Sequence, residues 1–147
     1  MEGDPLSEIV VDASIVVKWF VEEEWSREAR MLKDDYAAGE VDLIAPALMP
    51  FEVLNALRYS SAFGGEELIQ VAHILDDLQI TLYGLEGDYA EETVMLALGK
   101  GITVYDASYV ALAEIRKALL YTADEKLLRK LGGMNRVAHI RDYPIRR

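Results

Sequence analysis

Four acidic residues of this chain stand where they could do chemistry together. Asp12, Asp106 and Asp124 each follow an apolar or extended stretch and precede a predicted helix. Glu52 falls in the first turn of a helix predicted to begin near Pro50, because proline is tolerated only in a first turn. In an open parallel sheet, ligands bind at the edge where strands end and helices begin. We therefore expect these four carboxylates to converge at one edge of a sheet.

Clustered carboxylates have a cost that a metal ion can remove. Two like charges about 4 Å apart, at an effective dielectric of about 20, repel by about 4 kcal/mol. A hard divalent cation cancels this repulsion, and oxygen ligands suit Mg²⁺ or Mn²⁺ better than zinc. The chain contains no cysteine, which agrees with an oxygen-only site. One or two such ions can activate a water and neutralise a phosphate, so these residue types point to phosphodiester hydrolysis.

Each acid also has a purely structural interpretation, because helix N-termini favour negative charge. Asp12 and Asp106 could each serve only as a helix N-cap. Thr122 and Glu125 have the spacing of a capping box, which would leave Asp124 as an ordinary acid of a first turn. The glutamate could be a first-turn acid as well. The repeated placement between strand and helix favours a joint site over four separate caps.

Predicted strands alternate with predicted helices along the chain. Strands are expected at residues 8–12, 41–45, 79–83, 118–122 and 137–140. Helices are expected at residues 14–20, 26–38, 50–62, 66–78, 88–100 and 124–131, with a further helix that starts at Asp106 after a short extended approach. This last helix has an apolar stripe that includes Tyr109, and its small residues allow close packing against a sheet. The alternation predicts one α/β domain over residues 1–147, with a mainly parallel sheet and a frayed lead-in at residues 1–7.

The charge of the chain leaves the class of partner open. Its net charge is −11, whereas a nucleic-acid-binding protein normally carries a basic footprint. Either the partner is not a nucleic acid, or the negative charge is concentrated where a divalent cation would reverse the local field. Charge alone does not decide between these two interpretations.

The distribution of apolar residues indicates where the protein is located and whether it forms an oligomer. No apolar run approaches the roughly 20 residues that a membrane-spanning helix needs. The acidic start at residues 1–8 lacks the basic segment of a signal peptide, so we expect a cytoplasmic protein that does not enter a membrane. Apolar residues make up 52% of the chain, a mild surplus that an oligomer interface would explain.

Four motifs, in their order along the chain, resemble a PIN domain of the VapC toxin type. They lie at residues 9–14, 50–57, 105–113 and 122–127, and the resemblance extends over residues 8–143. It implies a compact three-layer α/β/α sandwich with metal-dependent activity against single-stranded RNA. It also implies a homodimer and, for the toxin branch, an antitoxin protein that blocks the cleft.

The resemblance also implies roles for individual residues. The four acids Asp12, Glu52, Asp106 and Asp124 match the acidic metal-binding positions of the family, where they would hold one or two Mg²⁺ or Mn²⁺ ions. Ser14 and Thr122 match small hydroxyl positions near the site. Asn55 lies about one helical turn after Glu52 on the same face.

Other functions were weighed against this expectation of an RNA-cleaving toxin. An RNA-processing nuclease of the same fold would share all four acids, and a non-catalytic protein-binding module would fit the acidity and the apolar surplus. A haloacid-type phosphatase needs a second aspartate two residues after the first, where this chain has Ser14. A phospho-accepting receiver needs an acidic pair at the first strand and a lysine at the end of a late strand, and the sequence has neither.

Overall fold

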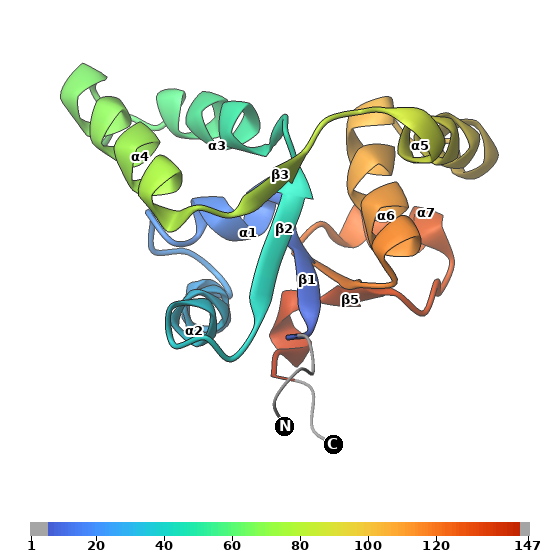
Figure 1. Cartoon of the computed structure of the whole chain (residues 1–147). Coiled ribbons are helices and arrows are strands. Elements are labelled where there is room, and N and C mark those ends of the chain that lie inside the picture. Colours follow the sequence, from blue (N-terminus) through green and yellow to red (C-terminus); the bar gives the residue numbers. More distant parts are fainter. Residues whose placement is uncertain (1–5, 145–147) are drawn as a thin grey trace.

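The computed structural model describes residues 6–144, which form a five-stranded parallel sheet covered by helices on both faces (Figure 1). The strand order is β3-β2-β1-β4-β5. The strands are β1 (Glu8–Val11), β2 (Asp42–Pro46), β3 (Thr81–Tyr83), β4 (Leu119–Thr122) and β5 (Val137–His139). Residues 1–5 of the predicted lead-in lie outside the described residues, and Leu6 and Ser7 precede β1 without regular structure.

Seven α-helices and one short 3₁₀ helix are found among residues 6–144. They are α1 (Ala13–Val17), α2 (Ser26–Ala37), α3 (Met49–Arg58), α4 (Gly65–Leu78), α5 (Gly87–Lys100), α6 (Val104–Arg116), α7 (Glu125–Leu131) and η1 (Ile140–Asp142). Figure 1 shows α1 to α4 on one side of the sheet and α5 to α7 on the other. The predicted three-layer α/β/α sandwich is therefore confirmed.

The central strands are buried on both faces. Val10, Val11 and Leu120 have no exposed surface, as expected for continuous apolar strands between two helical layers. Helix α6 packs against β1, β2 and β4, and every side chain from Ala107 to Ala113 is buried. The small residues of this stretch let α6 lie close to the sheet, which fixes its first turn beside the strand ends.

Besides α1, which ends at Val17 instead of residue 20, three predicted helix boundaries were wrong. Helix α6 already begins at Val104, so no strand leads into Asp106; Thr103 caps the helix by accepting a hydrogen bond from the Asp106 amide at 3.0 Å. Helix α3 ends at Arg58 instead of residue 62, and Gly64 precedes α4, where its amide donates to Glu67 Oε1 at 2.9 Å. The hydrogen bonds of Thr103 and Glu67 mark the starts of α6 and α4, and periodicity does not reveal them.

The third boundary concerns α7. Asp124 itself is the N-cap, because its Oδ1 accepts a hydrogen bond from the Leu127 amide at 3.0 Å. The capping box predicted from Thr122 and Glu125 is not formed. Thr122 Oγ1 instead accepts from the Asp124 amide at 3.0 Å, which holds the chain as it leaves β4.

Candidate functional site

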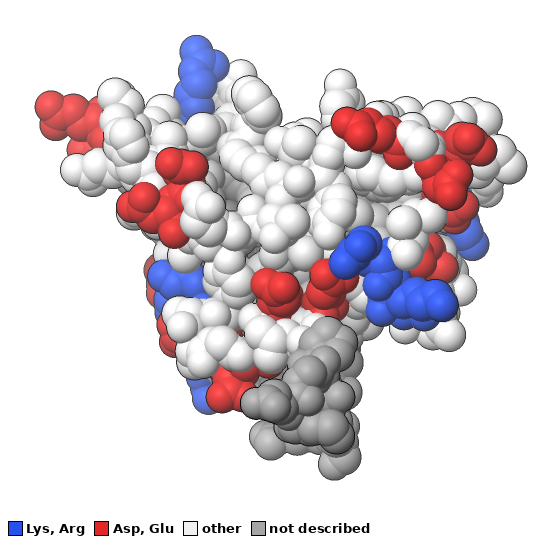
Figure 2. Space-filling model, in the orientation of Figure 1, with Lys and Arg blue, Asp and Glu red and all other residues white. Residues whose placement is uncertain are grey.

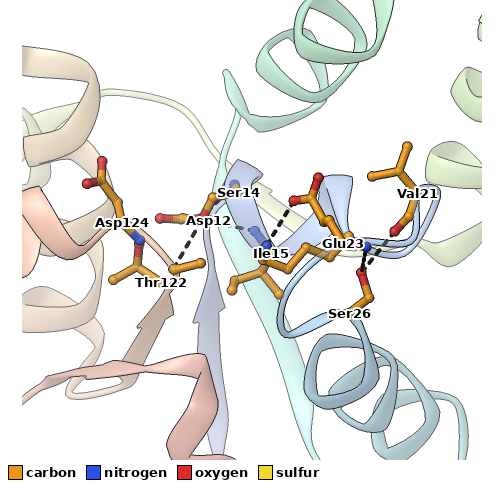
Figure 3. Close-up of polar contacts among 10 residues, drawn as sticks. Asp12, Ser14, Ile15, Val21, Glu23, Ser26, Thr122 and Asp124 are labelled. Atoms are coloured by element: carbon orange, nitrogen blue, oxygen red, sulfur yellow. Dashed lines mark hydrogen bonds and ion pairs between the residues drawn. The ribbon is translucent and has the colours of Figure 1, made fainter. Parts of the chain in front are cut away.

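The candidate site lies where the carboxyl ends of β1 and β4 meet. These strands are parallel neighbours, paired through Val11 and Tyr121, and the connections on their two sides cross opposite faces of the sheet. Such a reversal of strand order leaves a crevice at the carboxyl edge, where ligands bind in this class of fold. Figure 3 shows Asp12 and Ser14 after β1 close to Thr122 and Asp124 at the end of β4.

Asp12 is the buried member of the site, with only 7% of its surface exposed. Its Oδ1 accepts hydrogen bonds from the Ser14 amide at 2.8 Å and the Ile15 amide at 3.3 Å, so it does cap α1, as the structural interpretation required. Burial raises the pKa of Asp12, and hydrogen bonds from Ser14, Thr122 and the two amides oppose that rise. A helix cap does not need to be this deeply buried, so capping alone does not account for its position.

Glu52 comes from the first turn of α3 and is half-buried. Burial raises the pKa of Glu52 most, a hydrogen bond from Tyr109 lowers it, and the charges of Asp12 and Asp106 raise it further. The Glu52 carboxylate therefore senses two of the other three acids, although they come from β1 and α6.

Tyr109 holds Glu52 in place and was missed by the sequence analysis. The Tyr109 hydroxyl donates to Glu52 Oε1 at 2.6 Å, and only 3% of the residue is exposed. Burial, and then the contact with Glu52, raise the pKa of Tyr109, while a hydrogen bond from the Ala13 amide lowers it. The hydroxyl thus bridges the start of α1 and the carboxylate of α3. The available signal was its position three residues after Asp106, on the same helical face.

Asp106 and Asp124 form the open side of the site. Burial raises the pKa of Asp106 most, followed by the charge of Asp124, whereas the hydrogen bond with Thr103 and the charge of Lys130 lower it. Asp124 is exposed at the start of α7. Both aspartates line a cavity of about 330 Å³.

The three accessory residues predicted from the sequence lie beside these acids. Ser14 Oγ donates to Asp12 Oδ1 and accepts from the Ala123 amide at 3.2 Å, so it ties the end of β1 to the end of β4. Thr122 is fully buried and hydrogen bonds to Asp12. Asn55 is exposed on α3 and lines, with Glu52, a hollow of about 500 Å³.

The four possible metal ligands are all carboxylates, whose oxygens suit a hard cation. We refer to Asp12, Glu52, Asp106 and Asp124 as the carboxylate site. Within residues 6–144, no three Asp, Glu or His side chains lie close enough together to form a ready-made metal cage. Mg²⁺ does not need one, since it keeps several waters and is usually bound by one or two carboxylates together with substrate oxygens. The oxygen-only chemistry of these acids, and the charges of neighbouring acids that raise the pKa of Glu52 and Asp106, are compatible with such an ion.

A hollow of about 610 Å³ lies at the amino ends of the strands, is lined by Ser7, Lys117 and Pro144 among others, and contains none of the four acids. No helix of residues 6–144 combines the length and apolar character needed to cross a membrane.

Known proteins resemble this chain along most of its length. The sequence pattern of the PIN domain family matches residues 9–133. Ribonuclease VapC3 of Pyrobaculum aerophilum is 35% identical over 131 residues, which cover 86% of this chain and 96% of that protein. Among solved structures, PAE2754 of Pyrobaculum aerophilum superposes with a TM-score of 0.64 and 25% identity, covering 92% of this chain and 90% of that chain. A chain from a toxin–antitoxin complex of Klebsiella pneumoniae superposes with a TM-score of 0.67 and 19% identity, covering 90% and 97% of the two chains, a likeness that concerns the fold alone.

Proposed function

Because this chain belongs to the PIN domain family, we propose that it is a ribonuclease that hydrolyses internal phosphodiester bonds of RNA with Mg²⁺ or Mn²⁺. The observation that carries the proposal is the carboxylate site itself. In its support, the acids that follow β1, open α3, open α6 and cap α7 lie at the carboxyl edge of the sheet. Burial raises the pKa of Asp12, Glu52 and Asp106, and repulsion from another acid adds to the rise for Glu52 and Asp106. A relative with 35% identity that bears the name ribonuclease supports the same activity.

The roles of the residues follow from their positions. Asp12, Glu52, Asp106 and Asp124 would hold one or two ions, directly or through water. When bound, the ion lowers the pKa of a coordinated water and neutralises charge on the phosphate that is cleaved. Ser14 and Thr122 fix the Asp12 carboxylate by hydrogen bonds, and Tyr109 orients Glu52. Asp124, being exposed, is the acid that an incoming strand meets first.

The variant Asp106→Asn tests the activity. We expect the rate of cleavage of a single-stranded RNA, with Mg²⁺ or Mn²⁺ titrated, to fall by more than about 100-fold, because loss of even an outer-shell partner of a metal costs 10- to 100-fold. Asp88→Asn is the matched control, since Asp88 is an exposed first-turn acid of α5 that lines none of the hollows at the carboxylate site. A cleavage rate close to that of the unchanged protein in Asp106→Asn would refute the proposal.

A second measurement does not depend on activity. An ion that binds the folded state raises the melting temperature by mass action. Mn²⁺ should therefore raise the melting temperature of the unchanged protein and of Asp88→Asn, and raise that of Asp106→Asn less. An equal shift in all three proteins would place the ion elsewhere.

We further propose that the enzyme is the toxin of a toxin–antitoxin pair and forms a homodimer. The resemblance to VapC proteins supports both. Exposed apolar side chains on α5, namely Val94, Met95 and Leu98, offer a surface on which a second copy could pack. Expression should arrest growth, and co-expression of the product of a neighbouring small gene should relieve the arrest. A processing nuclease with the same four acids would not arrest growth.

Sedimentation of the unchanged protein should give the mass of two chains, and sedimentation of Leu98→Glu should give the mass of one.

A further inference from the structure

We infer that single-stranded RNA crosses the carboxylate site along one path, with a backbone phosphate beside Lys126 and Lys130 and an unpaired base against Phe51 and Tyr105. The inference deepens the proposed function, because it names the features of RNA that the same site would bind. It rests on the two hollows that flank the four acids, one basic and one aromatic.

The basic side is the cavity of about 330 Å³ that Asp106 and Asp124 share with Lys126 and Lys130. The two lysines are four residues apart on α7, so they project from the same helical face. Lys130 Nζ lies 3.4 Å from the Gly101 carbonyl oxygen at the end of α5, and its charge lowers the pKa of Asp106. In a chain with 26 acidic and 15 basic residues, this pair supplies positive charge beside the acids, where a phosphate would need it.

The aromatic side is the hollow of about 500 Å³ lined by Leu48, Phe51, Glu52, Asn55 and Tyr105. Phe51 is 77% exposed and Tyr105 is 64% exposed, which is unusual for such large rings. Each ring directly precedes a member of the carboxylate site in the sequence, namely Glu52 and Asp106. Aromatic rings next to a charged groove are the features by which proteins bind single strands, because any base can stack on a ring.

Apart from Glu52, the residues that line this hollow are uncharged. It adjoins a second hollow of about 240 Å³, which shares Leu48 and Tyr105 and is otherwise lined mainly by apolar residues such as Leu85 and Val104. Figure 2 shows this as an uncharged valley between α3 on one side and α5 and α6 on the other. The exposed Asn55 amide is the polar group at the rim, and it can both donate to and accept from the edge of a base.

The order of groups across the site follows from the linings of the two hollows. Asp106 and Asp124 line the basic cavity, whereas Glu52 lines the aromatic hollow together with Tyr105, the residue before Asp106. The lysine pair lies at the Asp124 end and the aromatic pair at the Glu52 end. A strand that spans both ends lays its backbone over Asp106. Only an unpaired base can stack in the aromatic hollow, because the bases of a duplex are paired to one another.

The experiment measures RNA binding with the full chain. A fluorescein-labelled oligouridine of roughly 12 nucleotides is titrated in EDTA, which prevents hydrolysis, at several KCl concentrations. In Lys126→Gln/Lys130→Gln, the slope of log affinity against log salt should shrink by about 0.7 to 1.4, the loss of one or two phosphate contacts. In Phe51→Ala/Tyr105→Ala, affinity should fall roughly 5- to 150-fold at every salt concentration, with the slope unchanged.

Matched controls exist for both variants. Tyr59 is 76% exposed beyond the end of α3 and lines neither hollow, so Tyr59→Ala should bind like the unchanged protein. Lys117 lies at the opposite end of the sheet, and Lys117→Gln should keep the original salt slope.

Three outcomes overturn the inference: no measurable binding by the unchanged protein, an unaltered slope in the lysine variant, or unaltered affinity in the aromatic variant. The last of these would assign the aromatic hollow to a protein partner. Failure of the proposed function is distinguishable, because cleavage with Mg²⁺ or Mn²⁺ is measured separately. If RNA binding follows these expectations but no RNA is cleaved, the path stands and the proposed activity fails. If RNA is cleaved but the variants bind it like the unchanged protein, the activity stands and the path fails.

Discussion

At the scale of single residues, the hydroxyl of Tyr109 is the contact that separates this site from a simple group of acids. It donates to Glu52 from a position inside the protein, and no water can replace it without a change in packing. Periodicity assigned Tyr109 to the apolar stripe of its helix. This assignment was correct for the ring, which is buried, but periodicity does not indicate what the hydroxyl binds. The four acids were within reach of sequence analysis because their type and spacing are visible in the sequence, whereas a hydrogen bond between α6 and α3 is not.

Replacing Tyr109 by Phe should therefore change the chemistry more than the fold. The hydrogen bond to Tyr109 opposes the rise in the pKa of Glu52, so its removal raises that pKa further. The acid limb of the pH profile of cleavage should shift to higher pH, and the rate should fall about 10- to 100-fold.

The control for this variant is Tyr89→Phe. The Tyr89 hydroxyl is also buried and donates to the Ser108 carbonyl oxygen at 2.8 Å, and burial raises the pKa of Tyr89 to about 12. Both variants should lose about 1 kcal/mol of unfolding free energy in urea, the net value of one hydrogen bond. Only Tyr109→Phe should move the pH profile, and a shift of equal size in both would assign Tyr109 a structural role alone.

At the scale of elements, the junction between β4 and α7 shows why a cap and a metal ligand are hard to tell apart. Asp124 accepts from the Leu127 amide and also faces Asp106 across the cavity. The sequence predicted the strand and the helix here, and offered a capping box of Thr122 and Glu125 as the structural alternative for Asp124. A cap at Thr122 would serve the Glu125 amide, whereas the cap at Asp124 serves the Leu127 amide, and the residue types fit either arrangement.

Asparagine and alanine at this position separate the two roles. Asparagine caps a helix about as well as aspartate, whereas alanine costs about 1 kcal/mol. In urea denaturation without metal, Asp124→Asn should match the unchanged protein and Asp124→Ala should lose about that amount. Both should lose RNA cleavage and most of the Mn²⁺-induced rise in melting temperature. Cleavage retained by Asp124→Asn would show that Asp124 is a cap and nothing more.

The start of α6 shows a further limit of sequence analysis. Val104 and Tyr105 favour extended structure by type, so the stretch before Asp106 was predicted to be extended. The Thr103 hydroxyl starts the helix there instead. The consequence for the site is small, because Asp106 still lies in the first turn of its helix.

At the scale of the whole molecule, the alternation of strands and helices was enough to predict an α/β fold with a mainly parallel sheet, and the family resemblance implied the three-layer sandwich. The strand order was not predictable in the same way, since periodicity says nothing about the direction in which each crossover runs. The net charge of −11 also did not show which class of partner the protein binds, because that depends on where the charges lie. Three acids with raised pKa values at one edge account for part of it.

These raised pKa values determine how stability depends on pH. An acid whose pKa is higher in the folded than in the unfolded state stabilises the fold fully below its ordinary pKa of about 4, and this contribution is lost as pH rises through the folded value. Without metal, the free energy of unfolding should therefore fall as pH rises toward neutrality through the raised values of Asp12, Glu52 and Asp106. Mn²⁺ should flatten this dependence, because it binds the ionised carboxylates.

Asp12→Asn isolates the contribution of the buried acid. The amide oxygen of asparagine can still accept from the amides of Ser14 and Ile15, but the buried charge is gone. Urea denaturation at several pH values should show a weaker dependence on pH than in the unchanged protein, and Asp88→Asn should show the original dependence. If the free energy of unfolding of Asp12→Asn depended on pH as strongly as that of the unchanged protein, the general acidity of the chain, and not this site, would set the pH dependence.

The hollow at the amino ends of the strands has a practical consequence. Ser7 and Pro144, near the two limits of the described chain, both line it, at the end of the strands opposite the four acids. A tether attached at Ser7 or Pro144 would therefore leave the molecule at the amino ends of the strands, opposite the four acids. Protein held on a sensor surface by such a tether would still present the lysines, the acids and the aromatic rings to an oligonucleotide in solution.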